Sequence, residues 1–315
     1  MNIARSLSEL HHDPNSVVTV GTFDGVHRAH QEIIREVVAR ARKRNGRAVV
    51  VTFEPHPKEV VESVKGPVQL LTSIEERMDK LVALDVDLLF IIPFSHEFSR
   101  LSSRTFYEQY VVRGVGVSEV VVGYDHMFGR DREGGVQELM NIGREFSFSV
   151  IAIPPFSVDG EIVSSTRVRN ALRAGNLARA RELLGYAYEL TGIIVRGDGR
   201  GKSLGFPTAN MRALTDKKVI PARGVYLVKA GVRKGLYHGM LNIGVRPTVT
   251  DGREEVIEVH LFDFTEYIYG ERITVSFLSK LRDEQRFATV VDLTQQLRKD
   301  EEVARRLISE QIKTN

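Results

Sequence analysis

The chain has 315 residues, and its 44 basic and 41 acidic side chains leave a net charge of +3, too small to indicate a nucleic-acid-binding face. The length is about twice that of a common domain, and 42% hydrophobic with 27% charged residues is typical of a globular protein, so we expect two folded domains. The absence of cysteine excludes disulfides, zinc–thiolate sites, iron–sulfur clusters and a cysteine nucleophile.

The N-terminal segment, residues 1–16, lacks the apolar stretch that a secretory signal peptide needs. The longest apolar runs, such as LLFIIPF at 88–94, are far shorter than the roughly 20 residues that cross a bilayer. We therefore expect a cytoplasmic protein without a membrane partner.

The first half alternates short apolar runs with amphipathic segments, which is the pattern of parallel strands joined by crossover helices. The predicted strands are 16–23, 46–53, 87–94, 118–125 and 148–156, and the predicted helices are 27–44, 74–84, 104–115 and about 135–146. Strands separated by helices in this way predict an α/β fold with a doubly wound parallel sheet.

The second half opens with a helical segment at 166–185, which Gly175 and Asn176 divide into two pieces. Short runs rich in Val, Ile, Tyr and Thr then follow with no helix between them, and this predicts an antiparallel β-barrel. The predicted strands are 191–197, 224–232, 236–244, 254–264 and 272–281, followed by a helix at about 289–312. We place the domain boundary near 184–187, which gives domains 1–185 and 186–315.

The segment GTFDGVHRAH, residues 21–30, ends the first strand and opens the first helix, so its loop lies at the carboxyl edge of the sheet, where nucleotides bind. Gly21 and Gly25, on either side of Phe23, let the backbone approach a ligand closely, and the helix N-terminus offers N–H groups to a phosphate. His27 and His30 are three residues apart and face one point. Taken alone, such a pair is more often a surface cap, but its position after the first strand favours a phosphate site.

The segment VSSTRVR, residues 163–169, places Ser165 and Thr166 at a predicted helix start, where hydroxyls cap free N–H groups. Arg169 follows one helical turn later. An ordinary helix cap with a solvated arginine explains this segment equally well when it is taken by itself. Together with the histidine pair, it predicts the second side of a phosphate site.

The segment GDGRGKSLGFPTAN, residues 197–210, combines several glycines with cations, and Gly201 and Lys202 are typical of a loop that surrounds a polyphosphate. It lacks the spacing of a Walker loop, and a plain β-turn is the alternative. Thr208 and Asn210 alternate on an extended segment, so both oxygens point to one side and suit Mg²⁺. Glu258 lies on a predicted strand, where an isolated glutamate is usually a solvent-facing residue.

The His27–His30 segment resembles the H-x-G-H signature of adenylyltransferases and cytidylyltransferases, with Ala29 where the signature has Gly. VSSTRVR resembles the S-S-T-x-x-R element with which that superfamily holds a triphosphate. Several further segments resemble the prokaryotic bifunctional riboflavin kinase and FAD synthetase family: TFEPHP (52–57), LLTSIEER (70–77), FSHEFSRLSSRTF (94–106), VVGYDHMFGRDREGG (121–135), PTAN (207–210), NIGVRPT (242–248), the E-x-H-L-x-D-F stretch that begins at Glu258, and LRDEQRF (281–287). The resemblance covers the chain from Val17 to about Ile308.

For domain 1–185 the resemblance implies transfer of AMP from ATP to the phosphate of FMN, which gives FAD and pyrophosphate. His27 and His30 then contact the phosphates, Arg169 holds the leaving pyrophosphate, and Mg²⁺ bridges the oxygens. Further nucleotide contacts are assigned to Gly21, Phe23, Gly25, Ser165 and Thr166. Flavin contacts are assigned to Phe53, Pro55, His56 and Asp125.

For domain 186–315 the resemblance implies phosphorylation of riboflavin to FMN by ATP. Glu258 is the base that takes the proton from the ribityl 5′-hydroxyl, and Thr208 with Asn210 binds metal and nucleotide. Gly201 and Lys202 contact the nucleotide phosphates, and Arg282 contacts the flavin.

Two other functions compete with this interpretation. A nucleotidyltransferase acting on a pantetheine or nicotinamide phosphate has no kinase barrel, and a flavin or nucleotide sensor retains the fold with altered sites, for which Ala29 is the one indication. The expected partners are riboflavin, FMN and ATP, with no nucleic acid. The sequence leaves homo-oligomerisation, the flavin redox state preferred and channelling of FMN between the sites open.

Overall fold

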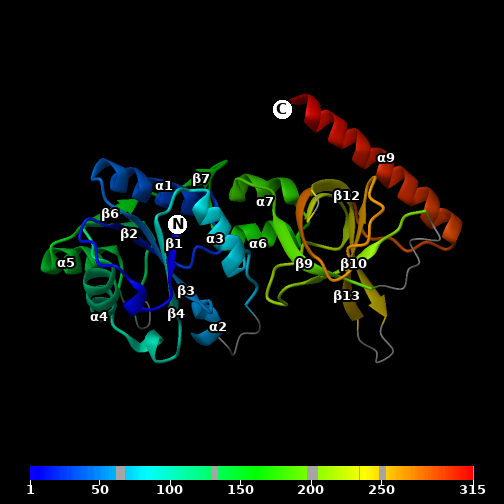
Figure 1. The fold of residues 1–315 in the computed structure, drawn as a ribbon. Helices are drawn as coiled ribbons and strands as arrows, with labels where there is room; N and C mark the ends of the chain where they lie inside the picture. The colour runs from blue at the N-terminus through cyan, green and yellow to red at the C-terminus, as the bar shows by residue number, and fades with distance from the viewer. Residues whose placement is uncertain (62–67, 130–133, 197–204, 234, 248–252, 315) are drawn as a thin grey trace. The chain divides into compact units, whose positions relative to one another are not determined.

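The computed structural model describes residues 1–61, 68–129, 134–196, 205–233, 235–247 and 253–314 (Figure 1). The chain divides into two compact units, Met1–Ser165 and Thr166–Asn315. No helix in these described ranges is long and apolar enough to cross a membrane.

Six parallel strands form the sheet in the described part of the first unit, in the order β1-β4-β3-β2-β5-β6. Their bounds are β1 (Asn2–Ala4), β2 (Val17–Val20), β3 (Ala48–Glu54), β4 (Leu88–Pro93), β5 (Glu119–Gly123) and β6 (Ser149–Ile153). The predicted parallel sheet is confirmed, and β1 is an additional edge strand that pairs with β4. Strands β3 and β5 lie on opposite sides of β2, so the connections reverse there, and ligands bind such folds outside the carboxyl ends of the strands at this point.

Helices cover both faces of this sheet because successive residues of a strand point to opposite sides. Val49, Val51 and Phe53 of β3 pack into one core layer, and Val50 packs into the other. The elements between the strands are η1 (Leu7–Glu9), α1 (Arg28–Lys43), α2 (Pro57–Val61), α3 (Ile74–Val82), η3 (Phe98–Arg100), α4 (Ser103–Phe106), η4 (Tyr107–Val115) and α5 (Val136–Phe146). The β7–β8 hairpin (Ser157–Val158, Glu161–Ile162) follows β6. The helix predicted at 104–115 is in fact a short α-helix that continues as the π-helix η4.

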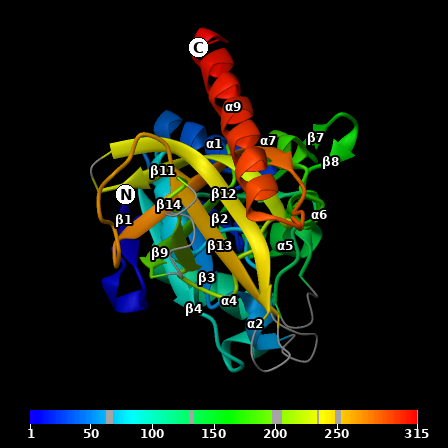
Figure 2. The ribbon, with the colours of Figure 1, turned by 90° about the vertical axis from the view of Figure 1, so that its right-hand side faces the viewer.

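Six antiparallel strands close a barrel in the described residues of the second unit, in the order β10-β13-β12-β11-β14-β9, and this confirms the predicted barrel (Figure 2). The barrel strands are β9 (Glu189–Val195), β10 (Ala209–Ala213), β11 (Gly224–Val232), β12 (Gly235–Pro247), β13 (Arg253–Leu261) and β14 (Arg272–Arg282). Helices α6 (Ser165–Arg173) and α7 (Leu177–Leu184) precede them in the chain, and α9 (Val290–Thr314) follows them. Helix α9 packs on the outside of the barrel, where its residues Leu297, Ala304 and Leu307 belong to one hydrophobic cluster with Leu227 and Met240.

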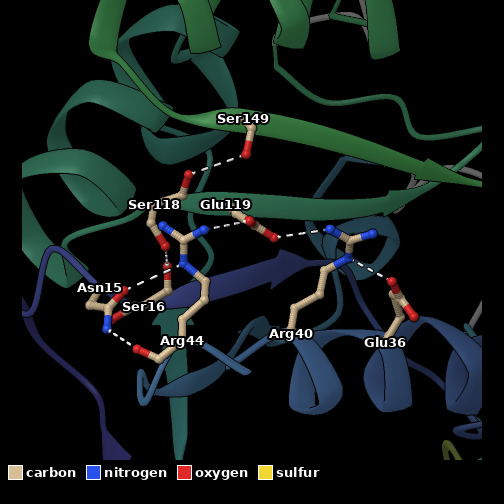
Figure 3. Close-up of polar contacts among 8 residues, drawn as sticks. All are labelled: Asn15, Ser16, Glu36, Arg40, Arg44, Ser118, Glu119 and Ser149. Atoms are coloured by element: carbon tan, nitrogen blue, oxygen red, sulfur yellow. Dashed lines mark hydrogen bonds and ion pairs between the residues drawn. The ribbon is translucent and has the colours of Figure 1, made fainter. Parts of the chain in front are cut away.

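The last turn of α1 is attached to the amino ends of β2 and β5 by a polar network (Figure 3). The Glu119 carboxylate, with its side chain 11% exposed, accepts hydrogen bonds from Arg40 (3.2 Å) and Arg44 (2.8 Å). Asn15 donates to the carbonyl of Arg44 at 2.7 Å, and the Ser118 hydroxyl donates to the carbonyl of Ser16 at 3.0 Å. These contacts fix the helix whose other end carries His27.

We predict that Glu119→Gln weakens this attachment by about 1–3 kcal/mol, because it removes a mostly buried charge that two arginines share. Hydrogen-exchange mass spectrometry of peptides from α1 and β5 measures the loss as faster exchange. Glu32→Gln is the matched control, since Glu32 pairs with the same residue type, Arg35, on the exposed face of α1. Equal exchange in the two variants would contradict the prediction.

Candidate functional site

The turn between β2 and α1 has an unusual backbone. Phe23 and Val26 have φ values of 48° and 35°, which residues with a side chain rarely adopt, and Gly25 has a φ of 83°. Such strain persists only where the surroundings enforce it, and here the Phe23 and Val26 side chains are buried in the core layer with Ile34 and Leu89. The turn that leads into the predicted phosphate site is therefore held in one strained conformation.

The Asp24 carboxylate connects this turn to the segment before α3. It is 1% exposed, and one of its oxygens accepts hydrogen bonds from the backbone N–H groups of Leu71 (2.9 Å) and Thr72 (3.0 Å). The Thr72 hydroxyl accepts in turn from the N–H of Gly25 at 2.9 Å. Segments that lie 47 residues apart in the chain are thus joined at the base of the turn.

The structure brings the imidazoles of His27 and His30 together at the start of α1. His27 is the N-cap, and its Nδ1 accepts a hydrogen bond from the N–H of His30 at 3.4 Å. The two rings stack with centroids 3.6 Å apart, and the Phe23 ring lies edge-on to His30. Burial, together with the charges of His27 and Arg77, lowers the pKa of His30 well below its usual value. His30 is therefore neutral near pH 7 and suited to donate a hydrogen bond to a phosphate.

Ser165, the second serine of the S-S-T element, also reaches this turn. Its Oγ donates to the carbonyl of Asp24 at 3.0 Å. Thr166 and Arg169 follow in the first turns of α6, which belongs to the second unit apart from Ser165.

The four residues expected to contact flavin lie in different environments. Phe53 is buried among the rings of Phe94, Phe98, Phe106 and Phe128. Pro55 follows a cis peptide bond, and the buried His56 accepts a hydrogen bond from the N–H of Lys58 through its Nδ1 at 3.1 Å, at the start of α2. Asp125 is exposed in the loop after β5. The loop after β5 contacts the core through Phe128, whose ring lies 5.7 Å from that of Phe53.

One polar pair in this region was missed from the sequence. The hydroxyl of the buried Tyr107 lies 3.0 Å from Nε2 of His126, in the loop after β5. Burial lowers the pKa of His126 to about 4 and raises that of Tyr107, so both side chains are neutral and the contact is an uncharged hydrogen bond. The VVGYDHMFG segment contained the histidine, but the tyrosine gave no signal because it lies inside the π-helix.

The second candidate site is a row of polar residues on three neighbouring barrel strands. Glu258 of β13 lies directly opposite Asn210 of β10 on one side and Asn242 of β12 on the other. Paired residues of an antiparallel sheet share a face, and the flanking Ile257 and Val259 are buried on the opposite face. The register therefore sets two amides beside one carboxylate. Asn242 was missed as a site residue, although the NIGVRPT segment contains it.

The segment before β10 is held close to this row. Thr208 is half-buried, and the carbonyl of its neighbour Pro207 lies 2.8 Å from Nδ1 of His260. In the described part of the chain, no group of three or more His, Asp or Glu side chains is arranged to hold a metal ion. The hydroxyl and amide oxygens of Thr208 and Asn210 nevertheless suit Mg²⁺, which takes few protein ligands together with substrate phosphates. Gly201 and Lys202, expected to contact phosphates, lie outside the described residues.

Arg282, expected to contact the flavin, connects β14 to α9. Its Nε donates to Asp300 at 2.9 Å and its Nη2 lies 2.9 Å from the same oxygen, while Nη1 donates to the carbonyl of Asp283 at 3.1 Å. Asp300 is 4% exposed, so this ion pair is buried and anchors the helix. A flavin contact of Arg282 stays a prediction.

Known proteins match both units. A model of the FAD synthetase family matches residues 9–167, and a model of the riboflavin kinase family matches residues 184–308. The bifunctional riboflavin kinase/FMN adenylyltransferase of Escherichia coli K12 is 37% identical over 97% of both chains. The chain belongs to the bifunctional riboflavin kinase/FMN adenylyltransferase family.

Other relatives agree with this family. The enzyme of the same name from Listeria monocytogenes is 36% identical over 93% of this chain and 92% of its own length, and that of Bacillus subtilis is 35% identical over 93% of both. A crystal structure described as a macrolide-efflux protein from Streptococcus pneumoniae is similar with a TM-score of 0.86 and 35% identity, over 96% of this chain and 98% of that one. The bifunctional family thus extends over nearly the whole chain, and the last structure shares its fold under another name.

We predict that Gly25→Ala destabilises the turn between β2 and α1 more than backbone strain alone explains. An added Cβ lies 2.7 Å from Cδ1 and 3.1 Å from Cβ of the buried Leu71. Gly160→Ala is the control, because Gly160 has a similar φ of 78° and nothing within 4 Å of an added Cβ. Thermal unfolding is expected to show a further loss of about 1–3 kcal/mol for Gly25→Ala. Equal losses of stability in the two variants would show that the Leu71 side chain moves away from the added methyl group without a cost in free energy.

Proposed function

We propose that this member of the bifunctional family makes FAD from riboflavin in two steps, each with its own residues. The C-terminal domain, 186–315, phosphorylates riboflavin to FMN through Glu258, and the N-terminal domain, 1–185, adenylylates FMN at His27 and His30. The observation that carries this proposal is the stacked histidine pair at the start of α1, beside the strand where the sheet reverses its connections. We place both reactions in the cytoplasm.

In the adenylylation, an oxygen of the FMN phosphate forms a bond to the α-phosphorus of ATP while the bond to pyrophosphate breaks. This nucleophile is already an anion, so the step needs no base, and catalysis consists of positioning and charge neutralisation. The N–H groups at the start of α1 and the ring N–H of the neutral His30 act as donors to phosphate oxygens. Ser165, Thr166 and Arg169 bind the triphosphate and hold the leaving pyrophosphate, and Gly21, Phe23 and Gly25 shape the turn against the nucleotide.

In the phosphorylation, the ribityl 5′-oxygen forms a bond to the γ-phosphorus of ATP, ADP leaves, and Glu258 accepts the hydroxyl proton. This hydroxyl is uncharged, which is why the second site has a carboxylate base and the first does not. The amides of Asn210 and Asn242 on both sides of Glu258 orient its carboxylate toward the hydroxyl.

Thr208 and Asn210 would hold Mg²⁺ together with the phosphates of ATP, and the ion would supply neutralisation of phosphate charge. Gly201 and Lys202 contact the same phosphates. The flavin is held by Phe53, Pro55, His56 and Asp125 in the first domain, and Arg282 contacts it in the second.

Incubation of the protein with riboflavin, ATP and Mg²⁺, followed by separation of the flavins, tests the proposal against both competitors. A nucleotidyltransferase for another substrate forms no FMN, and the barrel argues against it. A flavin sensor forms neither product. Formation of FMN without FAD would show that the adenylylation site, which has Ala29 in place of the signature glycine, does not act on FMN.

We predict that Glu258→Gln abolishes FMN formation while added FMN is still converted to FAD, because the amide cannot take the hydroxyl proton. Each reaction is measured separately by chromatography of the flavins. Glu255→Gln is the matched control, since Glu255 lies three positions away on β13 and faces the other side of the sheet. Loss of both activities in Glu258→Gln would contradict the division of labour.

We predict the reverse for His27→Ala, which is expected to lose FAD formation and keep riboflavin phosphorylation. Because His27 also caps α1, His27→Asn serves as a control that keeps a capping acceptor and removes the imidazole. If the imidazole acts on phosphate, both variants lose adenylylation by at least about tenfold. Normal FAD formation in His27→Asn would reduce the role of this residue to helix capping.

A further inference from the structure

Arg77 of α3 is a buried cation close to Asp24 in the turn between β2 and α1. Its side chain is 0% exposed, and its Nη1 donates to the hydroxyl of Thr52 at 3.1 Å. Its Nε and Nη2 are buried and have no hydrogen-bond partner among the residues that the structure describes. A buried guanidinium with two unused donors is costly to the fold, and such a group is rarely retained for stability alone.

A chain of contacts leads from Arg77 to the turn. The Thr52 hydroxyl, which accepts from Arg77, itself donates to the carbonyl of Thr22 at 3.2 Å. The N–H of Arg77 donates to the carbonyl of Ser73, which follows directly on Leu71 and Thr72, the partners of Asp24. The side chain of Arg77 therefore connects α3 to the turn, and α3 itself begins directly after the segment that binds Asp24.

Three carboxylates from different parts of the first unit act on the charge of Arg77. Negative charges of Asp24 in the turn, Glu54 in β3 and Glu75 in α3 act on the guanidinium, while burial lowers its pKa. An arginine remains protonated even so. On the side of α1, the positive charges of Arg77 and His27 both act on His30. One buried cation is thus stabilised by Asp24 and disfavours the charged form of His30.

We infer that Arg77 is a positioning residue for FMN adenylylation: through Thr52 and the carbonyl of Thr22 it holds the strained turn that directs His27 and His30 at a phosphate. This inference rests on the proposed adenylyltransferase function of the first domain. Arg77 is enclosed by protein and acts through other residues, so it affects the rate of the step and contacts neither substrate.

The test compares Arg77→Met, which keeps an unbranched apolar stem and removes the guanidinium and its charge, with Arg77→Lys, which keeps the charge. Arg77→Met is expected to lower kcat for FAD formation by at least about tenfold, because a misdirected donor stabilises the transition state poorly, and to change KM for FMN and ATP much less. Arg77→Lys is expected to recover kcat to within about threefold of the original chain, because the cation is restored. Riboflavin phosphorylation by the same preparations shows whether the second domain is intact.

A nuclear magnetic resonance titration of His30 gives a readout that a merely structural role would not change. The pKa of His30 is expected to rise in Arg77→Met and to stay low in Arg77→Lys, because removal of a nearby positive charge favours the imidazolium. The signal is assigned with a His30→Asn variant. Arg35→Met, which removes an exposed arginine of α1, is expected to leave both activities and the titration unchanged.

Each outcome decides one question. An original chain that forms no FAD refutes the proposed function, whereas a folded Arg77→Met variant with normal kcat refutes the positioning role alone. A loss confined to KM also overturns it. If Arg77→Met does not fold, Thr52→Val decides the matter, since it breaks the contact to Thr22 and keeps the side-chain volume: a tenfold lower kcat supports the inference, and a normal kcat overturns it.

Discussion

The constraint on which the first unit depends is the buried carboxylate of Asp24. A carboxylate in the core is tolerable only with donors on its oxygens, and here two backbone N–H groups of the segment before α3 provide them. The same turn has positive φ values at Phe23 and Val26, which residues with a side chain rarely adopt. The positions of His27 and His30 depend on the conformation of this turn, because His27 caps α1 and His30 lies in its first turn.

The second unit directs its polar groups by a different principle. Glu258 and its two neighbouring asparagines are brought side by side by strand register, with no strained residue among them. Register in a closed barrel is strongly specified, because a slip of one residue would turn Ile257 and Val259 out of the core. The Arg282–Asp300 ion pair then sets α9 against the barrel. The position of His27 and His30 thus depends on a strained turn that a buried carboxylate holds. The position of Glu258 depends on the alternation of buried and polar residues along the barrel strands.

The sequence predicted the elements whose signals are local. Five parallel strands, the barrel and the break at Gly175 follow from apolar periodicity and from glycine, which here has a φ of 71°. The strand β1 was missed because three residues carry no pattern, and the π-helix because its amphipathic pattern resembles that of an α-helix. The stacking of His27 and His30 was predictable from their spacing, whereas the contact of Asp24 with Thr72 and the register of Asn242 with Glu258 join distant segments and required the fold.

The charge of +3 conceals how these sites use charge. Arg40 and Arg42 of α1 and Arg44, the residue that follows the helix, are each held in an ion pair with Glu119 or Asp87 at the end remote from His27. At the histidine end of the same helix, burial lowers the pKa of His30, so this side chain is an uncharged donor. In the proposed site, a neutral donor gives direction without binding every anion in solution, and Arg77, a fully buried cation, is inferred to position the turn without contacting the substrate. Discrimination between phosphates in this domain then depends on geometry more than on net charge.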